Sequence, residues 1–163
     1  MTGGVVGYVV GRPAEPAAVT EPHGERPQLR ALSPAEEEYA AALWPIHSEV
    51  KMAAIKATFA GILYKTGDGD LSRLRATLQD LGSTFERAQV SAVALSVPPS
   101  IASVHERYLE ALGLYRKSAS TVLAADGPAI DAQLLTAQEL SFRASEGTLV
   151  VGDVLWPSEH KPH

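Results

Sequence analysis

Residues 71–95 read LSRLRATLQDLGSTFERAQVSAVAL, and this stretch decides the fold. Its apolar side chains recur at alternating steps of three and four residues, which is a heptad pattern. The apolar positions are Leu71, Leu74, Leu78, Leu81, Phe85, Ala88, Ala92 and Leu95. Polar and charged residues fill most of the remaining positions, so one narrow face is apolar and the opposite face is solvated. The pattern predicts an amphipathic helix that buries one stripe against neighbouring helices.

The composition is that of a globular protein with one domain and a tail. The chain has 163 residues, of which 45% are hydrophobic and 20% are charged. Its net charge of -5, with no basic stripe, argues against nucleic-acid binding, because such binding depends on clustered lysines and arginines. The sequence has no cysteine, which excludes disulfides, thiolate zinc sites and iron–sulfur clusters.

The first 32 residues differ from the rest of the chain. Residues 1–11 form an apolar stub in which Gly3, Gly7 and Gly11 recur every four residues, a spacing that lets membrane helices approach closely. The stub is shorter than the roughly 20 residues that span a bilayer. It is interpreted either as the end of a membrane anchor that begins upstream, or as an apolar terminus that frays or packs on the domain. Residues 12–32 carry four prolines and no apolar period, which predicts an extended linker.

A first helix is predicted to begin after Ser33. Ser33, Pro34 and Glu36 have the pattern of a capping box with proline in the first helical position. Two apolar stripes follow side by side, so the second half of this helix is expected to be buried on nearly all sides. Pro45 lies inside the pattern, and the helix is expected to kink or divide there.

Three further breaks separate the remaining predicted helices. Asp70 is placed to cap the heptad helix, and the pair Pro98 and Pro99 ends that helix and begins the next. Asp126 precedes the last helix, which runs to about residue 155. Short connections force successive helices to be antiparallel neighbours. We therefore predict an all-α protein in which residues 33–163 form an up-down-up-down antiparallel four-helix bundle. Its first helix is kinked, and a short C-terminal tail follows the last helix. Residues 1–32 form an extended N-terminal tail before the bundle.

The last predicted helix has an unusual apolar stripe, because its middle positions are small. Ser141, Ala144 and Thr148 occupy them, and Gly147 lies alongside. Small residues allow a tight crossing against a bulky neighbour such as Phe59, Phe85 or Tyr108, which is the interpretation we favour. The alternative is a space between the helices that holds a ligand.

Three histidines are the candidate metal ligands. His47 on the first predicted helix and His105 on the third are expected at nearly the same height along the bundle axis. His160 lies in the tail that returns to the same end of the bundle. Histidine ligates transition metals and haem. However, the predicted helices carry no His-x-x-x-His or Glu-x-x-His pair, so the di-iron bundle pattern is absent. The alternative is that His47 and His105 make ordinary hydrogen bonds.

Two Trp-Pro pairs are expected at that same end of the bundle. Trp44 precedes Pro45 in the first helix, and Trp156 precedes Pro157 where the last helix ends. An indole at each of these points is suited to cover the open end of the apolar core.

No catalytic motif stands out, so we expect neither an enzyme nor a bound cofactor. The leading hypothesis is a scaffold or accessory protein, anchored to a membrane by its N-terminal segment on the extracytoplasmic side, that acts by protein–protein contact. Its layout is similar to that of membrane-tethered helical bundles of bacteria. The partner is another protein or a second copy that binds an exposed part of the first helix. The alternative hypothesis is a carrier that holds a metal, haem or apolar small molecule between the helices.

Overall fold

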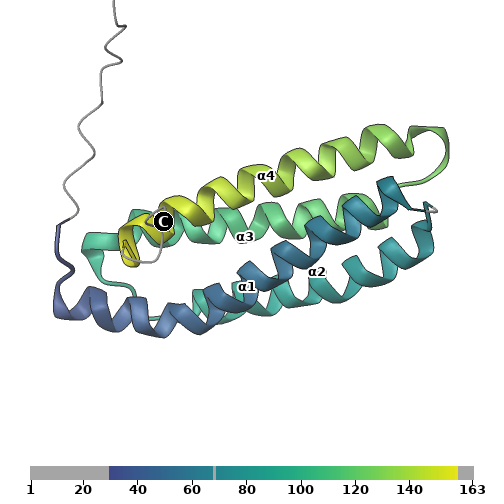
Figure 1. Ribbon diagram of the computed structural model, residues 1–163. Coiled ribbons are helices and arrows are strands. Elements are labelled where there is room, and N and C mark those ends of the chain that lie inside the picture. Colours follow the sequence, from purple (N-terminus) through teal and green to yellow (C-terminus); the bar gives the residue numbers. More distant parts are fainter. Residues whose placement is uncertain (1–29, 68, 158–163) are drawn as a thin grey trace, which may run out of the picture.

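The computed structural model describes residues 30–67 and 69–157 and is a four-helix bundle (Figure 1). The long helices are α1 (Pro34–Thr66), α2 (Leu71–Val93), α3 (Ala102–Leu123) and α4 (Ile130–Leu155), and the short 3-10 helices η1 (Pro99–Ile101) and η2 (Gly127–Ala129) precede α3 and α4. Successive long helices run antiparallel, and these residues contain no strand. The predicted all-α bundle is therefore confirmed. The stub, most of the linker and the end of the C-terminal tail lie outside the described residues.

The helix starts follow the sequence signals. The Ser33 hydroxyl accepts a hydrogen bond from the Glu36 backbone N–H at 3.4 Å, and the Glu36 carboxylate accepts one from the Ser33 backbone N–H at 2.7 Å. This pair is the predicted capping box, with Pro34 in the first turn. At the start of α2, the Asp70 carboxylate accepts from the Arg73 backbone N–H at 3.0 Å. No helix in the described part of the chain is long and apolar enough to cross a membrane.

The heptad stripe of α2 forms the centre of the core, as predicted. Its buried members are Leu74, Leu78, Leu81, Phe85, Ala88 and Ala92. Leu71 and Leu95, at the two ends, are partly buried against them. The ring of Phe85 stacks on that of Tyr115 of α3, with centroids 4.8 Å apart and planes 9° apart. The stripe thus holds α2 against its neighbours along its whole length.

Pro45 bends α1 without dividing it. The helix is continuous from Pro34 to Thr66 with Pro45 inside it. Figure 1 shows that the axis of α1 changes direction in its first half. A proline inside a helix removes one backbone hydrogen bond and crowds the preceding turn, which accounts for the bend.

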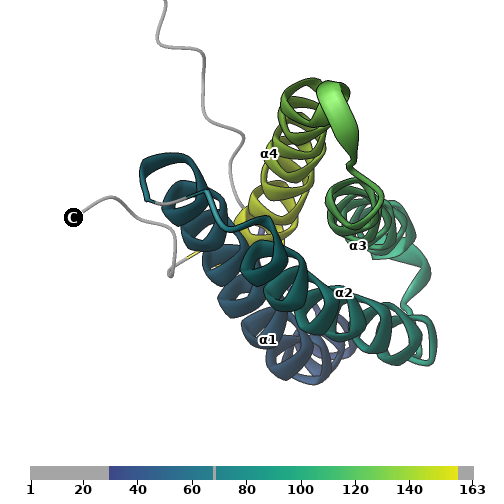
Figure 2. The same cartoon turned by 90° about the vertical axis from the view of Figure 1, so that its right-hand side faces the viewer.

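The prediction that the second half of α1 is buried on nearly all sides is wrong. Apolar side chains there are 40% to 61% exposed, namely Met52, Ile55, Phe59, Ile62 and Leu63. The reason is the packing of the helices, since α1 and α4 touch far less than the other three neighbouring pairs do. Figure 2 shows α1 beside α2 and α4 beside α3, with α1 leaning away from α4 toward the end that faces the viewer. One face of α1 is therefore left without a neighbouring helix.

The contact between α3 and α4 is close, and small residues make it possible. A Cβ atom added to Gly147 would lie 3.1 Å from the Cβ of Ala111 on α3. The predicted tight crossing is present, but Gly147 approaches the small Ala111 rather than a bulky side chain. Here α3 and α4 approach through small residues on both helices.

Alanine at two helical glycines should separate backbone propensity from this close approach. A Cβ atom added to Gly113 of α3 would have nothing within 4 Å of it. Gly113→Ala is therefore expected to raise the free energy of unfolding by about 0.5–1 kcal/mol. Gly147→Ala is expected to give a free energy of unfolding about 1 kcal/mol lower than Gly113→Ala gives, because Ala111 must move. Urea unfolding followed by circular dichroism measures both, and equal gains at the two positions would contradict the close contact.

Candidate functional site

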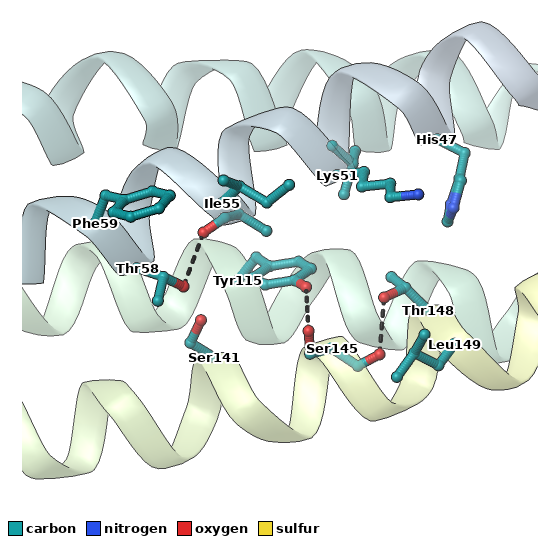
Figure 3. Close-up of a pocket in the computed structure, with 12 residues that line it drawn as sticks. His47, Lys51, Ile55, Thr58, Phe59, Tyr115, Ser141, Ser145, Thr148 and Leu149 are labelled. Atoms are coloured by element: carbon teal, nitrogen blue, oxygen red, sulfur yellow. Dashed lines mark hydrogen bonds between the residues drawn. The ribbon is translucent and has the colours of Figure 1, made fainter. Parts of the chain in front are cut away.

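An open groove runs between α1 and α4, with α3 at its floor. Its volume is about 380 Å³. Figure 3 shows the side chains of α1 on one side, those of α4 on the other, and Tyr115 of α3 between them. The lining residues are His47, Val50, Lys51, Ala54, Ile55, Thr58 and Phe59 of α1, Tyr115 of α3, and Ser141, Ser145, Thr148 and Leu149 of α4. The groove lies where α1 and α4 make little contact.

Several hydroxyl groups in the groove are already hydrogen-bonded within the protein (Figure 3). Tyr115 Oη donates to Ser145 Oγ at 3.3 Å, and Thr148 Oγ1 donates to the Ser145 carbonyl at 2.9 Å. Thr58 Oγ1 donates to the Ala54 carbonyl at 3.0 Å. Because these donors are used inside their own helices or between α3 and α4, the groove offers mainly apolar surface. Its chemistry suits contact with an apolar partner.

Large apolar side chains of α1 and α4 are exposed to solvent beside the groove, and we call these two sets its rims. Ile55, Phe59 and Leu149 among them line the groove itself. On α1, Met52, Ile55, Phe59 and Ile62 follow one another at steps of three, four and three residues. On α4, Leu135, Phe142 and Leu149 follow at steps of seven. Phe59 is 61% exposed and Phe142 is 65% exposed. Apolar surface gathered in this way marks an interaction site more often than isolated exposed residues do.

The sequence carried a signal for this surface that the prediction did not use. Ser141, Ala144 and Thr148 of α4 belong to the predicted apolar stripe, whereas Phe142 and Leu149 repeat at seven-residue steps beside it. A second stripe of bulky residues on a helix whose first stripe is already buried indicates a second contact. Ser141 and Thr148 also line the groove, so part of the small-residue stripe does border a space between helices.

His47 and His105 each contact aromatic rings near the end of the bundle where α1 and α3 begin, and His47 also lines the groove at that end. His105 is buried, and its Nδ1 lies 2.8 Å from the Tyr39 hydroxyl. His47 is buried too, with its ring centroid 4.8 Å from that of Trp156 and 6.0 Å from that of Tyr108. Burial lowers the pKa of His105, although the charge of the neighbouring Glu106 opposes the shift, which favours a neutral imidazole in hydrogen bonding to Tyr39.

These histidines do not assemble a metal site with other residues that the structure describes. Within residues 30–67 and 69–157, no group of three or more His, Cys, Asp or Glu side chains could hold a metal ion. His160, the third candidate ligand, lies outside those ranges. The predicted hydrogen-bonding role is found for His105, and the metal site remains a prediction.

The two tryptophans meet at this same end, as predicted. The ring centroids of Trp44 and Trp156 are 5.0 Å apart in an edge-on arrangement. Trp156 follows the last residue of α4 and packs on the core, where it also contacts His47. The pair covers the end of the core and brings the end of α4 against α1 there.

A buried carboxylate, which the sequence marked only as a helix cap, fixes the chain just before α1. Glu36 is 1% exposed and accepts a hydrogen bond from the Ser100 hydroxyl at 2.7 Å, besides the bond from Ser33. Arg30 Nη1 donates to Glu36 Oε2 at 2.7 Å, and Arg30 Nη2 donates to Oε1. These partners, Arg30 first, hold the pKa of Glu36 far below its ordinary range. Glu36 therefore joins the end of the linker, α1 and η1.

Comparison with protein-family models, with curated proteins and with solved structures finds no match to this chain.

Proposed function

We propose that this protein is a non-enzymatic scaffold or accessory protein whose groove between α1 and α4 binds helical segments of protein chains. The observation that carries the proposal is the pair of exposed apolar rims beside a groove of about 380 Å³. Phe59 of α1 lines the groove, and Phe142 of α4 follows the lining residue Ser141. An amphipathic helix that enters such a groove presents apolar residues at three- and four-residue steps. The exposed apolar residues on the rim of α1 recur at the same three- and four-residue steps.

The packing of the bundle supports this proposal. The heptad stripe of α2 is buried by neighbours in the same chain, whereas the stripe through Ile55 and Phe59 on α1 is not. A helix laid along the groove would bury this stripe and restore the contact that α1 lacks on that side. Each square ångström of apolar surface removed from water contributes about 25 cal/mol, so burial of several such side chains supplies the affinity.

A photoreactive amino acid at the rims tests the proposal in cells. The residue p-benzoylphenylalanine, which inserts into C–H bonds within its reach, is placed at Phe59 or at Phe142. Val90 is the matched control, because it is an apolar residue of α2 that is 68% exposed. We expect both rim positions, and not Val90, to give discrete protein adducts. The adducts at Phe142 should be lost when Ile55→Glu puts a charge on the opposite rim.

Two results would contradict the proposal. One is an absence of discrete adducts at both rims. The other is the same set of adducts at Val90 as at Phe59, which would show that the probe reports random collision. Circular dichroism of each variant provides the check that the bundle remains folded.

We also propose that residues 1–11 attach the bundle to a membrane on its extracytoplasmic side, with residues 12–32 as the spacer. The apolar, glycine-spaced composition of the stub supports this, together with the prolines of the linker. The full chain should sediment with membranes after a salt wash, and protease added outside intact cells should cleave it. A chain that stays in the soluble fraction, with or without residues 1–11, would contradict the anchor.

A ligand carrier is the second candidate, and the size of the groove favours it. Small-molecule sites typically enclose about 300–1,000 Å³ and are mainly apolar, and this groove has both properties. Purified protein would then change its absorption spectrum on addition of haem or copper, or would bind an apolar dye that a fatty acid displaces. Ser145→Phe fills the groove and should abolish this binding. A spectrum that does not change, together with no displaceable dye, would exclude the carrier.

A further inference from the structure

The charges beside the two apolar rims have opposite signs. From residue 51 to the end of α1, the charged residues are Lys51, Lys56 and Lys65, with no acidic residue among them. Along α4 the charged residues are Asp131, Glu139, Arg143, Glu146 and Asp153, so acidic residues predominate. We call these residues of α1 the basic wall and those of α4 the acidic wall. Of them, only Lys51 lines the groove itself, and Arg143 and Glu146 border a second hollow between α3 and α4. At one end of the groove, Lys65 Nζ and Asp131 Oδ1 already pair across it at 3.0 Å.

We propose that the partner that covers the groove is a second copy of this chain, whose α1 and α4 pack on the two rims, related by a two-fold axis that runs parallel to the helices. This inference rests on the proposed function, since it names the occupant of the same groove. The axis places α1 of each copy against α4 of the other, so a basic wall meets an acidic wall twice. A two-fold axis across the helices would instead oppose α1 to α1 and α4 to α4, which brings like charges together.

The positions of the rim residues along the bundle axis agree with a two-fold axis parallel to the helices. Lys65 pairs with Asp131, and Ile55 and Ser145 both line the groove, so antiparallel α1 and α4 place Phe59 and Phe142 at similar heights. An axis parallel to the helices keeps heights unchanged. Phe59 of one copy then lies near the level of Phe142 of the other, and two such aromatic contacts form. Each helix also lies against an antiparallel helix of the other copy, which is favourable for the helix dipoles.

The size of the face sets the strength of the dimer. From Leu135 to Leu149 the rim of α4 extends about 21 Å, at 1.5 Å per residue. Two helices of about 10 Å diameter give a face about 20 Å wide, so two such faces bury on the order of 1,000 Å² in total. That area is near the lower limit for a specific interface. The dimer is therefore weak and reversible.

Sedimentation velocity of the full chain over about 1 to 300 µM tests the dimer. We expect the mass to rise with concentration from 17.3 kDa toward twice that value. Phe59→Glu should raise the dissociation constant about hundredfold, because it places a charge in the apolar contact. Val90→Glu, an equivalent change on the exposed face of α2, should leave it unchanged. Circular dichroism shows whether each variant keeps its helices.

Charge reversal tests the orientation of the two copies. The variant Lys51→Glu/Lys56→Glu makes both walls acidic, and the variant Glu139→Lys/Glu146→Lys makes both walls basic. Each alone should weaken its own dimer about tenfold. A mixture of the two should form a heterodimer at least as stable as the wild-type dimer, because every α1 then faces a wall of opposite charge.

Other outcomes overturn the inference. A chain that stays monomeric over the whole range excludes the second copy, as does a dimer that Phe59→Glu and the charge variants leave unchanged. The proposed function fails separately, by the absence of rim-specific adducts in cells. A monomeric chain whose rims form adducts with a different protein would thus exclude the dimer and retain the groove as a protein-binding surface.

Discussion

Phe85→Ala is expected to lower the free energy of unfolding by about 3–5 kcal/mol, whereas the same change at Phe59 should alter it by about 0.5 kcal/mol or less. Phe85 is 1% exposed and stacks on Tyr115, so its removal leaves a cavity at the centre of the bundle. Phe59 is 61% exposed on the rim of the groove and leaves none. The two changes delete the same atoms, so the difference measures burial alone.

Urea unfolding followed by circular dichroism measures both variants, at the lowest protein concentration that gives a signal. Low concentration matters because association of two copies would itself stabilise the folded chain. Phe142→Ala, on the opposite rim, is a second control and should behave like Phe59→Ala. If Phe59→Ala cost as much as Phe85→Ala, the rim would belong to the folding core, and its role as a binding surface would lose its main support.

The fold was predictable because one helix has a strict pattern. In α2 every leucine and the one phenylalanine fall on a single heptad stripe, so the direction in which it buries its large side chains has one solution. Strong breaks separate it from its neighbours, with Asp70 at one end and Pro98 at the other. Once the helices and short connections were fixed, antiparallel neighbours followed. These features are local in sequence, which is why sequence reasoning reached them.

The groove was not predicted, because a sequence pattern cannot say what covers an apolar stripe. The stripe through Ile55 and Phe59 satisfies the same spacing rules as the stripe of α2. Its exposure depends on the angle between α1 and α4, which arises from the packing of all four helices. On α4 the close contact of Gly147 with Ala111 holds the helix against α3. Only the tertiary structure contains that information.

The environment of Glu36 was beyond sequence reasoning for a similar reason. Its bond to Ser33 is local and was predicted as part of a capping box. Its bond to Ser100 joins residues 64 positions apart, and no periodicity in the sequence relates them. Likewise, helix lengths alone predicted that His47 and His105 lie nearly level, whereas His105 contacts Tyr39, which precedes His47 on α1. The contact of His105 with Tyr39 required the rotation of each helix about its axis.

Glu36→Gln is expected to make the stability of the bundle less sensitive to acid. In the folded chain, Arg30, Ser33 and Ser100 hold the pKa of Glu36 far below its ordinary value of 4.5. As the pH falls through 4.5, the unfolded chain therefore takes up a proton at this carboxyl before the folded chain does. The stability that Glu36 contributes is complete above that pH. It is lost progressively as the pH falls toward the lowered pKa.

Melting temperatures at pH values from about 7 to about 3 measure this effect. At pH 7, Glu36→Gln should melt below the wild type, because a neutral amide binds Arg30 less strongly than a carboxylate does. The difference in melting temperature between the two proteins should narrow below about pH 4.5, because only the wild type loses the stability contributed by the Glu36 carboxylate. Glu38→Gln removes an exposed carboxyl of the same turn and should keep the wild-type profile. A constant gap at every pH would mean that the ionised carboxylate does not hold Arg30 and Ser100 to the start of α1.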